Sequence, residues 1–346
     1  MRYFLSFLSA VMLCALTSPV FAEAPPTSRS FVLWAGSASA DSCITAKCHA
    51  VFGRAKHVHL PVAEGDCMVC HKSDGQPHPG TGVIGLIEAE PGLCLECHDN
   101  PAEGMAFPHT IVEEGCTGCH NAHQGDLPSY VPQSGGKLCL SCHEDVTEGQ
   151  YTHGPVKAEN CQLCHGIHGG QHEAMLNLPG KDNCLTCHAG IKTIMDNAVS
   201  QHEPVANGVC WDCHAPHSSD YKPFLKAFYT QKLYTPYYES RNFALCFDCH
   251  DEGAFTYDLT SEVTEFRNRY QNLHYFHVNR PRKGRVCRNC HGVHGADQEK
   301  LLMSKVPGFG KWEIPLKWVT DGERSTCYVG CHRPKTYSSL RKIKNR

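Results

Sequence analysis

The chain has 346 residues, a formal net charge of −3, 23 cysteines and 24 histidines. The near balance of acidic and basic residues gives no support for nucleic-acid binding. Beyond the first 22 residues, no apolar run approaches the roughly 20 residues that a membrane helix needs, so we expect no transmembrane helix.

The chain begins with the features of an export signal. A basic residue precedes an apolar run at residues 3–16, and a Ser-Pro pair and Val-Phe-Ala follow it. This order predicts a signal peptide over 1–22, cleaved after Ala22, with an N-terminal extension over 23–42. Cys14 lies inside the apolar run and would be removed with it. We therefore expect an exported protein that is periplasmic, associated with the outer membrane or extracellular.

The other 22 cysteines form eleven close pairs, each followed directly by a histidine. An even cysteine count outside the cytoplasm ordinarily suggests disulfides, but bridges across so few residues gain little stability. Zinc sites also use Cys-x-x-Cys, but they place no demand on the next residue. The pairs are Cys43 and Cys48, Cys67 and Cys70, Cys94 and Cys97, Cys116 and Cys119, Cys139 and Cys142, Cys161 and Cys164, Cys184 and Cys187, Cys210 and Cys213, Cys246 and Cys249, Cys287 and Cys290, and Cys327 and Cys331.

Cys-x-x-Cys-His is the attachment signature of c-type haem. One helical turn places both thiols along one edge of the porphyrin and brings the next imidazole under the iron as the proximal ligand. The pattern predicts about eleven covalent haem c groups. CITAKCH (43–49) and CYVGCH (327–332) have wider spacings, and the sequence leaves open whether both carry haem. The proximal histidines are His49, His71, His98, His120, His143, His165, His188, His214, His250, His291 and His332.

Thirteen further histidines are available as distal ligands, which favours irons bound by two histidines. Ten recur at set positions, before the second motif of a unit (His59, His109, His153, His202, His277) or after it (His78, His123, His168, His217, His294). The eleventh ligand, which we expect at the haem on Cys327 and Cys331, comes from His57, His172 or His274. The sequence does not assign each distal histidine to an iron.

The motifs repeat as five two-haem units, at 43–78, 94–123, 139–168, 184–217 and 246–294, with a lone motif at 327–332. We expect a compact eight-haem region over 43–217 and a three-haem region with aromatic-rich insertions over 218–346. Roughly 30 residues per haem cannot build a conventional core, so the porphyrins themselves must form the core. The predicted fold is a multihaem cytochrome c, mostly loops with short α-helices and little or no β-sheet.

The last third of the chain departs from the repeat. Apolar residues at helical spacing predict a helix over 261–277, capped by Ser261 and carrying His277 on its apolar stripe. Segment 311–319 alternates but contains Pro315, so we expect an edge strand at best. This segment and the tyrosine-rich stretch 221–238 serve either as docking surfaces or as packing over an exposed haem. A basic cluster over 280–285 either meets haem propionates or forms a solvated loop.

The segment 152–188, THGPVKAENCQLCHGIHGGQHEAMLNLPGKDNCLTCH, resembles the doubled CxxCH repeat of multihaem c-type cytochromes. It is similar in particular to the decahaem electron conduits that thread outer-membrane porins in metal-reducing bacteria. This resemblance, which covers roughly residues 43–294, implies a periplasm-facing conduit with irons bound by two histidines throughout. It also implies a porin and other redox cytochromes as partners.

Three functions compete at this point. Two axial imidazoles leave no iron position for a substrate, which favours an electron-transfer protein without enzymatic activity. A self-associating subunit of an extracellular haem filament is the second, in which a neighbouring subunit would supply a ligand to a terminal iron. A multihaem reductase is the third, and it needs one open iron, for which the haem on His332 is the candidate.

Overall fold

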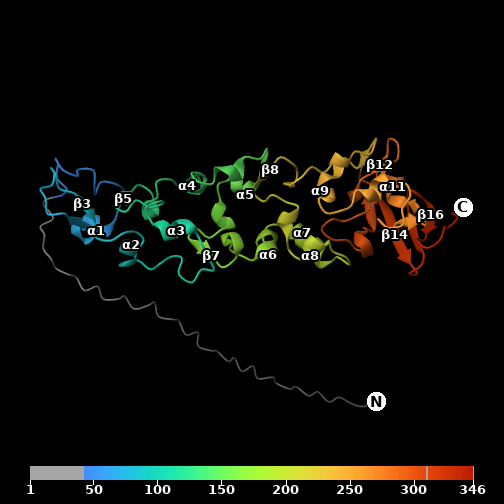
Figure 1. Ribbon diagram of the computed structural model, residues 1–346, viewed down its shortest axis with the longest axis horizontal. Helices are drawn as coiled ribbons and strands as arrows, with labels where there is room; N and C mark the ends of the chain where they lie inside the picture. The colour runs from blue at the N-terminus through green and yellow to red at the C-terminus, as the bar shows by residue number, and fades with distance from the viewer. Residues whose placement is uncertain (1–42, 309–310, 346) are drawn as a thin grey trace, which may run out of the picture.

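The computed structural model describes residues 43–308 and 311–345. The expected signal peptide and extension, with Cys14, lie outside the described residues. The chain follows the long axis of an elongated molecule in sequence order, from the first cysteine motif at one end to a C-terminal sheet at the other (Figure 1). None of the described helices is both long enough and apolar enough to cross a bilayer.

The helices are short, as expected, and most of them carry or flank a cysteine motif. The first motif of units two to five begins in α2, α4, α6 or α9, whereas four of the second motifs begin in a 3₁₀ turn, at Cys67, Cys161, Cys210 and Cys287. The α-helices are α1 Leu60–Glu64, α2 Gly92–Leu95, α3 Thr110–Glu114, α4 Gly136–Leu140, α5 Gly154–Lys157, α6 Gly180–Leu185, α7 Ala189–Asp196, α8 Glu203–Ala206, α9 Ala244–Phe247, α10 Gly253–Thr256 and α11 Leu273–Val278.

Two-residue antiparallel pairs join consecutive repeats. They are β1 His57–Val58 with β5 Gln124–Gly125, β4 Phe107–Pro108 with β7 Gly169–Gly170, and β6 Tyr151–Thr152 with β8 Ser218–Ser219. A bridge between Ser200 and Ala296 is the fourth of the series. Each pair joins the segment before an upstream histidine to the segment after a downstream histidine of the next unit. The repeats therefore interlock.

Three more short pairs and one larger sheet complete the strands. The short pairs are β2 His71–Ser73 with β3 Ile84–Leu86, β9 Tyr234–Thr235 with β12 Gly284–Arg285, and β10 Arg267–Asn268 with β11 Gln271–Asn272. The larger sheet is antiparallel in the order β13 Lys305–Pro307, β14 Glu313–Thr320, β15 Ser325–Val329, β16 His332–Tyr337.

The C-terminal sheet corrects the expectation of an edge strand at best over 311–319, because β14 is an inner strand. Ile314 and Leu316 point into an apolar cluster with Val306 on β13. Pro315 lacks an N–H, but its carbonyl still accepts a hydrogen bond from the Gly330 N–H at 3.1 Å. One missing donor is tolerated here because β13 is only three residues long.

The helix expected over 261–277 is wrong except for its last part, which lies in α11. The preceding residues form the β10–β11 hairpin, in which Arg269 has a φ of +58°. Asn272, not Ser261, caps the helix, because its Oδ1 accepts from the Tyr275 N–H at 3.2 Å. The fully buried Asn272 amide also donates to the carbonyls of Ala254 and Tyr257. These tertiary hydrogen bonds override the apolar periodicity.

Conventional apolar cores form only in the last part of the described chain. One contains Leu225, Tyr229, Phe243, Val278 and Val286, and the other is the β13–β14 cluster. Among the described residues that precede Met195, no apolar side chain is fully buried by the polypeptide. This distribution agrees with the expectation that the repeats pack around cofactors instead of around side chains.

Replacing Ile314 by alanine should destabilise the C-terminal sheet. The deletion leaves a cavity beside Val306 and Leu316, which typically costs about 3 kcal/mol. Hydrogen exchange measured by mass spectrometry should show a matching loss of protection in β14 and β15. Val319→Ala on the exposed face of the same strand is the control, with an expected change below about 0.5 kcal/mol. Equal losses in both variants would contradict a core at this position.

Candidate haem sites

The cysteine motifs adopt the turn that covalent haem attachment needs. In eight of the eleven, the N–H of the motif histidine donates to the carbonyl of the first cysteine at 2.9–3.1 Å, which closes one helical turn. No disulfide joins any of the 22 described cysteines, so the disulfide alternative finds no support in these residues. The first motif lies in an irregular turn, and the last lies on the β15–β16 hairpin. The expectation of a helical turn at every motif is therefore wrong for these two.

The two cysteines of a motif differ in exposure, although the sequence predicts them as equivalent attachment residues. Every first cysteine is half-buried. The second cysteine is exposed in the first motif of each unit and in the last motif, and half-buried in the remaining motifs. The exposed ones are Cys48, Cys97, Cys142, Cys187, Cys249 and Cys331, and the half-buried ones are Cys70, Cys119, Cys164, Cys213 and Cys290. The polypeptide alone therefore leaves one thiol of many motifs uncovered, which suits a thiol that a porphyrin edge would cover.

Backbone hydrogen bonds keep most of these second cysteines in the motif turn. In these motifs the N–H of the second cysteine donates to the carbonyl of the first cysteine. The bond is 3.1 Å long for Cys164, 3.2 Å for Cys119 and Cys142, and 3.3 Å for Cys187 and Cys249. In addition, the Thr186 hydroxyl donates to the Cys187 sulfur at 3.8 Å. The turn thus orients both thiols of these motifs.

Cys48 departs from this arrangement, as the wider spacing of its motif suggests. Its N–H donates to the Thr45 Oγ1 at 3.0 Å, and its carbonyl accepts from the Thr45 N–H at 2.7 Å. The extra residues of CITAKCH therefore form a local turn of their own. His49, directly after Cys48, takes a φ of +47°, in the left-handed region that residues other than glycine rarely adopt.

Ten of the eleven motif histidines face a second histidine, with ring centroids 5.9–6.4 Å apart. The pairs, motif histidine first, are His49–His78, His71–His123, His98–His59, His120–His168, His143–His109, His165–His217, His188–His153, His214–His294, His250–His202 and His291–His274. The eleventh, His332, lies near His277. Burial lowers the pKa of His277, and the nearby charge of His332 lowers it further.

This spacing fits an iron held between two imidazoles. A bond from a metal to an imidazole nitrogen is about 2 Å, and each ring centre lies about 1 Å beyond its nitrogen, so the two centroids should be about 6 Å apart. Two histidines in direct hydrogen-bond contact would bring their ring centres closer together. The geometry of the ten pairs therefore suits a six-coordinate haem iron.

Hydrogen bonds to Nδ1 orient many of these rings, which leaves Nε2 directed at the partner ring. The second-motif histidine of units two to five repeats the same bond, to the carbonyl nine residues further on. These bonds are His120 to Ser129 at 2.7 Å, His165 to Ala174 at 2.8 Å, His214 to Pro223 at 3.1 Å and His291 to Lys300 at 3.1 Å. Such bonds fix the tautomer and the orientation of a ligating histidine.

The carbonyls that accept these bonds belong to a strained turn. Ser129, Ala174 and Lys300 have φ values of +57°, +54° and +58°, in the left-handed region. The same conformation at equivalent positions in three repeats indicates that the fold holds it in place. Backbone strain of this kind persists where surrounding structure requires it, as at ligand sites.

The histidine pairs connect different repeats. An upstream histidine faces the first motif of the next unit, as in His59 with His98. A downstream histidine faces the second motif of the preceding unit, as in His123 with His71. The two distal histidines of a crossing are themselves tied, because the His59 N–H donates to the His123 carbonyl at 2.9 Å. The same bond recurs at 2.9 Å between the backbones of His109 and His168 and of His153 and His217.

Of the three histidines left open for the eleventh distal position, His274 faces a motif histidine, His291, with the ring centroids 6.4 Å apart. We expected this histidine at the motif of Cys327 and Cys331, but the histidine that lies near His332 is His277. Burial lowers the pKa of His274 to about 4, so its imidazole is neutral and able to bind a metal. Among the described residues, His57 and His172 face no motif histidine. The sequence signal for this arrangement was the presence of two histidines, His274 and His277, about one helical turn apart on α11.

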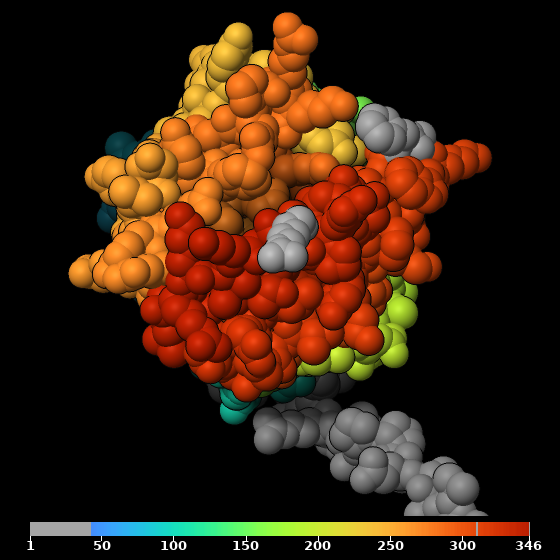
Figure 2. All heavy atoms as spheres, turned by 90° about the vertical axis from the view of Figure 1, so that its right-hand side faces the viewer, coloured from blue at the N-terminus to red at the C-terminus, as the bar shows by residue number. Residues whose placement is uncertain are grey.

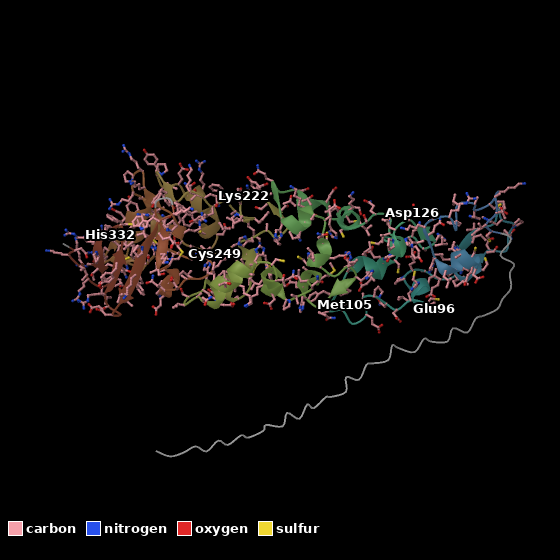
Figure 3. The ribbon with its side chains drawn as sticks, turned by 180° about the vertical axis from the view of Figure 1, so that it is seen from behind. Glu96, Met105, Asp126, Lys222, Cys249 and His332 are labelled. Atoms are coloured by element: carbon pink, nitrogen blue, oxygen red, sulfur yellow. The ribbon has the colours of Figure 1, made fainter. Side chains whose placement is uncertain are left out.

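The cysteines form a line through the molecule. Within each unit the first cysteines of the two motifs lie side by side, as Cys94 and Cys116 do, with their sulfur atoms within 4.8 Å. Sulfur atoms appear at intervals along the ribbon (Figure 3). Cys249 is labelled between the middle of the molecule and its C-terminal end, where His332 is labelled.

The line continues from one unit to the next. The second motif of a unit approaches the first motif of the following unit. Burial raises the pKa of Cys70, Cys139, Cys213 and Cys290, and the nearby thiol of the other motif raises it further. A hydrogen bond with Cys210 raises the pKa of Cys184 most, and the nearby Cys164 thiol adds to this increase. These approaches are Cys70 to Cys97, Cys119 to Cys139, Cys164 to Cys184, Cys213 to Cys249 and Cys290 to Cys327. Haems attached at these positions would therefore follow one another closely along the molecule.

A zinc site is the alternative for Glu90, Cys94 and Cys116, whose ligand atoms cluster together. However, the Glu90 carboxylate already accepts hydrogen bonds from the Cys116 N–H at 2.7 Å, the Thr117 N–H at 2.9 Å and the Thr117 hydroxyl at 2.7 Å. Burial raises the pKa of Glu90, but these bonds outweigh it and lower the pKa overall. Glu90 therefore caps the turn of the second motif of its unit, at 116–120, and not that of the motif at 94–98 that directly follows it in the sequence.

The basic cluster over 280–285 lies close to the last motif. The Arg285 guanidinium lies 3.4 Å from the Cys331 sulfur and donates to the Tyr234 hydroxyl at 2.9 Å. Arg280 stacks on Phe276, with 3.6 Å between its guanidinium carbon and the ring centre. At least one arginine of the cluster is thus positioned beside the site of the eleventh haem.

Fold and sites together define a multihaem c-type cytochrome with covalently bound haem c. The family described as Doubled CXXCH motif matches residues 59–103, 109–148, 153–193 and 202–255, just over half of the chain, and the chain belongs to this family. Each matched stretch begins at an upstream histidine, and that histidine faces the second motif of the same stretch. A search of curated proteins found no match. Doubled motifs of this kind indicate electron transfer through several haems.

Replacing His274 or His277 by alanine should open one iron in each variant. An iron that loses one axial histidine becomes five-coordinate and, when reduced, binds carbon monoxide. We expect one carbon monoxide per protein in each single variant and two in the double variant. His172→Ala is the matched control and should bind none. These ligand assignments would be contradicted if the control or the unmodified protein bound as much carbon monoxide as the single variants.

Proposed function

We propose that all eleven motifs carry haem c, that two histidines bind every iron, and that the protein conducts respiratory electrons across the periplasm or outer membrane toward extracellular acceptors. The observation that carries this proposal is the unbroken series of opposed histidines along the length of the molecule. It runs from His49 and His78 at one end to His291 and His274 near the other, and His332 in the last motif lies near His277.

The residues of this chain suit electron transfer better than bond chemistry. Bound haem supplies a centre that changes oxidation state by one electron. The paired histidines would hold the iron, and their Nδ1 hydrogen bonds would limit movement of the rings when the oxidation state changes. The adjacent cysteines of successive motifs would hold neighbouring haems close, so that electrons could move in many short steps.

A multihaem reductase is less well supported, because it needs an iron with one open position. The candidate for such an iron was the haem on His332. His277 lies there, on α11, and its Nδ1 donates to the Leu273 carbonyl at 2.6 Å, which orients Nε2 away from its own helix. We therefore propose that the protein has no substrate-binding iron and is not an enzyme.

A haem filament is also less well supported. In the described residues both terminal motifs find their second histidine inside the same chain, so no neighbouring subunit is required. Charge also opposes head-to-tail contact, since residues 43–56 contain Lys47, Arg54 and Lys56 and no acidic residue. The opposite end, at residues 305–345, has nine lysines and arginines against three acidic residues.

The resemblance to decahaem conduits supports a porin as one partner and other cytochromes as electron donor and acceptor. The repeats form a long body in which cofactor positions follow the sequence, and such a body is suited to cross a barrier lengthwise (Figure 1). The C-terminal sheet lies at one end of this body only. We propose that this end remains outside a porin.

Intact mass spectrometry of the secreted protein should give the mature polypeptide plus eleven haem masses. The oxidised protein should show only low-spin haem, because two imidazoles on each iron produce a strong ligand field. A double variant, Cys43→Ser with Cys48→Ser, is informative, since it should lower the count by one and leave ten low-spin haems. A count of nine in the unmodified protein would mean that the two irregular motifs carry no haem.

Deletion of the gene tests the route of the electrons. We expect the deletion strain to lose reduction of an insoluble extracellular acceptor and to keep growth on a soluble acceptor that enters the periplasm. Complementation with the unmodified gene should restore the activity, and complementation with a His277→Ala variant should restore it only in part. Unchanged reduction of the insoluble acceptor in the deletion strain would contradict the proposed route.

A further inference from the structure

Charge is distributed very unevenly along the chain. Residues 61–266 contain 9 lysines and arginines and 28 acidic residues, a net charge of −19. Residues 267–346 contain 18 lysines and arginines and 5 acidic residues, a net charge of +13. Haem would strengthen the contrast, because each ferric haem with two propionates adds about one negative charge and most motifs precede residue 267. The molecule is therefore an acidic rod with a strongly basic C-terminal part, and its other end carries the three basic residues Lys47, Arg54 and Lys56.

Segment 305–345, which carries nine lysines and arginines against three acidic residues, lies at the C-terminal end of the molecule (Figure 1). Viewed along the long axis, the C-terminal residues fill much of this end (Figure 2). The three acidic residues of segment 305–345 are already paired, Glu313 with Lys305 at 3.7 Å, Asp321 with Arg324 at 2.9 Å, and Glu323 with Arg341 at 3.1 Å. Exposed basic residues of this segment that have no ion-pair partner among the described residues are Lys311, Lys317, Arg333, Lys342 and Lys344.

An apolar depression lies among these charges. It has a volume of about 560 Å³, and its lining includes Pro315, Lys317, Tyr328, Gly330 and Pro334. Tyr328 is exposed on β15, whereas the neighbouring Cys327 packs against the cluster on the inner face of the sheet. Because neighbouring side chains of a strand point to opposite faces, the first cysteine of the last motif lies on the opposite face of β15 from Tyr328 in the depression.

We propose that this C-terminal end face, defined by β13–β16 and the basic residues above, docks an acidic redox protein and exchanges electrons with it through the eleventh haem. This inference rests on the proposed function. In each encounter one electron moves between the iron bound by His332 and the centre of the partner, so that one is oxidised as the other is reduced, without transfer of a proton.

Several features favour a protein with an acidic surface as the partner. The apolar depression can accept a side chain, and the surrounding lysines attract carboxylates and accelerate association. A flat lipid surface would use the charge but not the depression, and it could not accept an electron. A second copy, approaching with its other end, would bring Lys47, Arg54 and Lys56 against another basic surface.

The test compares two triple charge reversals in the full-length haem-loaded protein. Lys317→Glu/Lys342→Glu/Lys344→Glu alters the end face, and Lys47→Glu/Arg54→Glu/Lys56→Glu makes the same charge change at the opposite end. The probe is an acidic plant-type ferredoxin. Binding is measured with both proteins oxidised, so that no electron moves, and reduction of the haems by reduced ferredoxin is then followed by stopped flow at low and high ionic strength.

We expect the end-face variant to lose roughly tenfold in affinity and in bimolecular rate at low salt, and the control to change less than about twofold. The salt dependence of the unmodified protein should be weaker in the end-face variant only. Equal effects in the two variants would overturn the proposal. Tighter binding to phosphatidylglycerol vesicles than to ferredoxin, or salt-sensitive self-association in sedimentation, would overturn it in favour of a membrane or a second copy.

The experiment distinguishes a failure of the docking proposal from a failure of the proposed electron-transfer function. If the end-face reversal abolishes binding but the haem count is below eleven, the docking surface is confirmed and the proposed series of eleven haems is wrong. If all haems are present and reducible but ferredoxin binds both variants equally, the proposed series of haems is confirmed and the docking surface is wrong.

Discussion

The fold depends on the pairing of histidines, each pair of which, in the function proposed above, would hold a single iron between two imidazoles. Because the two histidines of most pairs come from different repeats, each pair joins segments that are distant in sequence. His71 and His123, for example, are brought together from consecutive units, and the backbone bond between His59 and His123 lies at the same crossing. In the proposed function, iron coordination by these pairs would replace the apolar packing that the described residues before Met195 do not supply.

The sequence predicted the attachment motifs well because attachment is local: two thiols and an imidazole within one turn leave an unmistakable spacing. It could not predict that the two thiols of one motif differ in exposure, as Cys139 and Cys142 do, because exposure depends on how neighbouring repeats pack. It predicted ten of the distal histidines from their recurrence. It could not predict which motif histidine each one faces. Pairing within one unit and pairing between neighbouring units give the same spacing of histidines in the sequence. His274 was left among three candidates, since its role depends on how α11 approaches His291.

The last third was predicted least well, and the reason is physical. There the chain builds its own cores, so tertiary contacts decide the local structure. The buried amide of Asn272 shortens the helix expected over 261–277. The cluster of Val306, Ile314 and Leu316 makes an inner strand of a segment that contains Pro315. Periodicity and proline position are weaker determinants than burial in a packed cluster.

The change from cofactor packing to peptide packing coincides with the change of charge. The repeat region carries most of the acidic residues, and the propionates of bound haems would add to this negative charge, so the repeat region would repel other acidic proteins. A sheet with its own core can carry lysines such as Lys317 on one face while Cys327 lies on the other. The C-terminal sheet therefore provides what the repeat cannot, a stable surface for recognition directly over the end of the haem series.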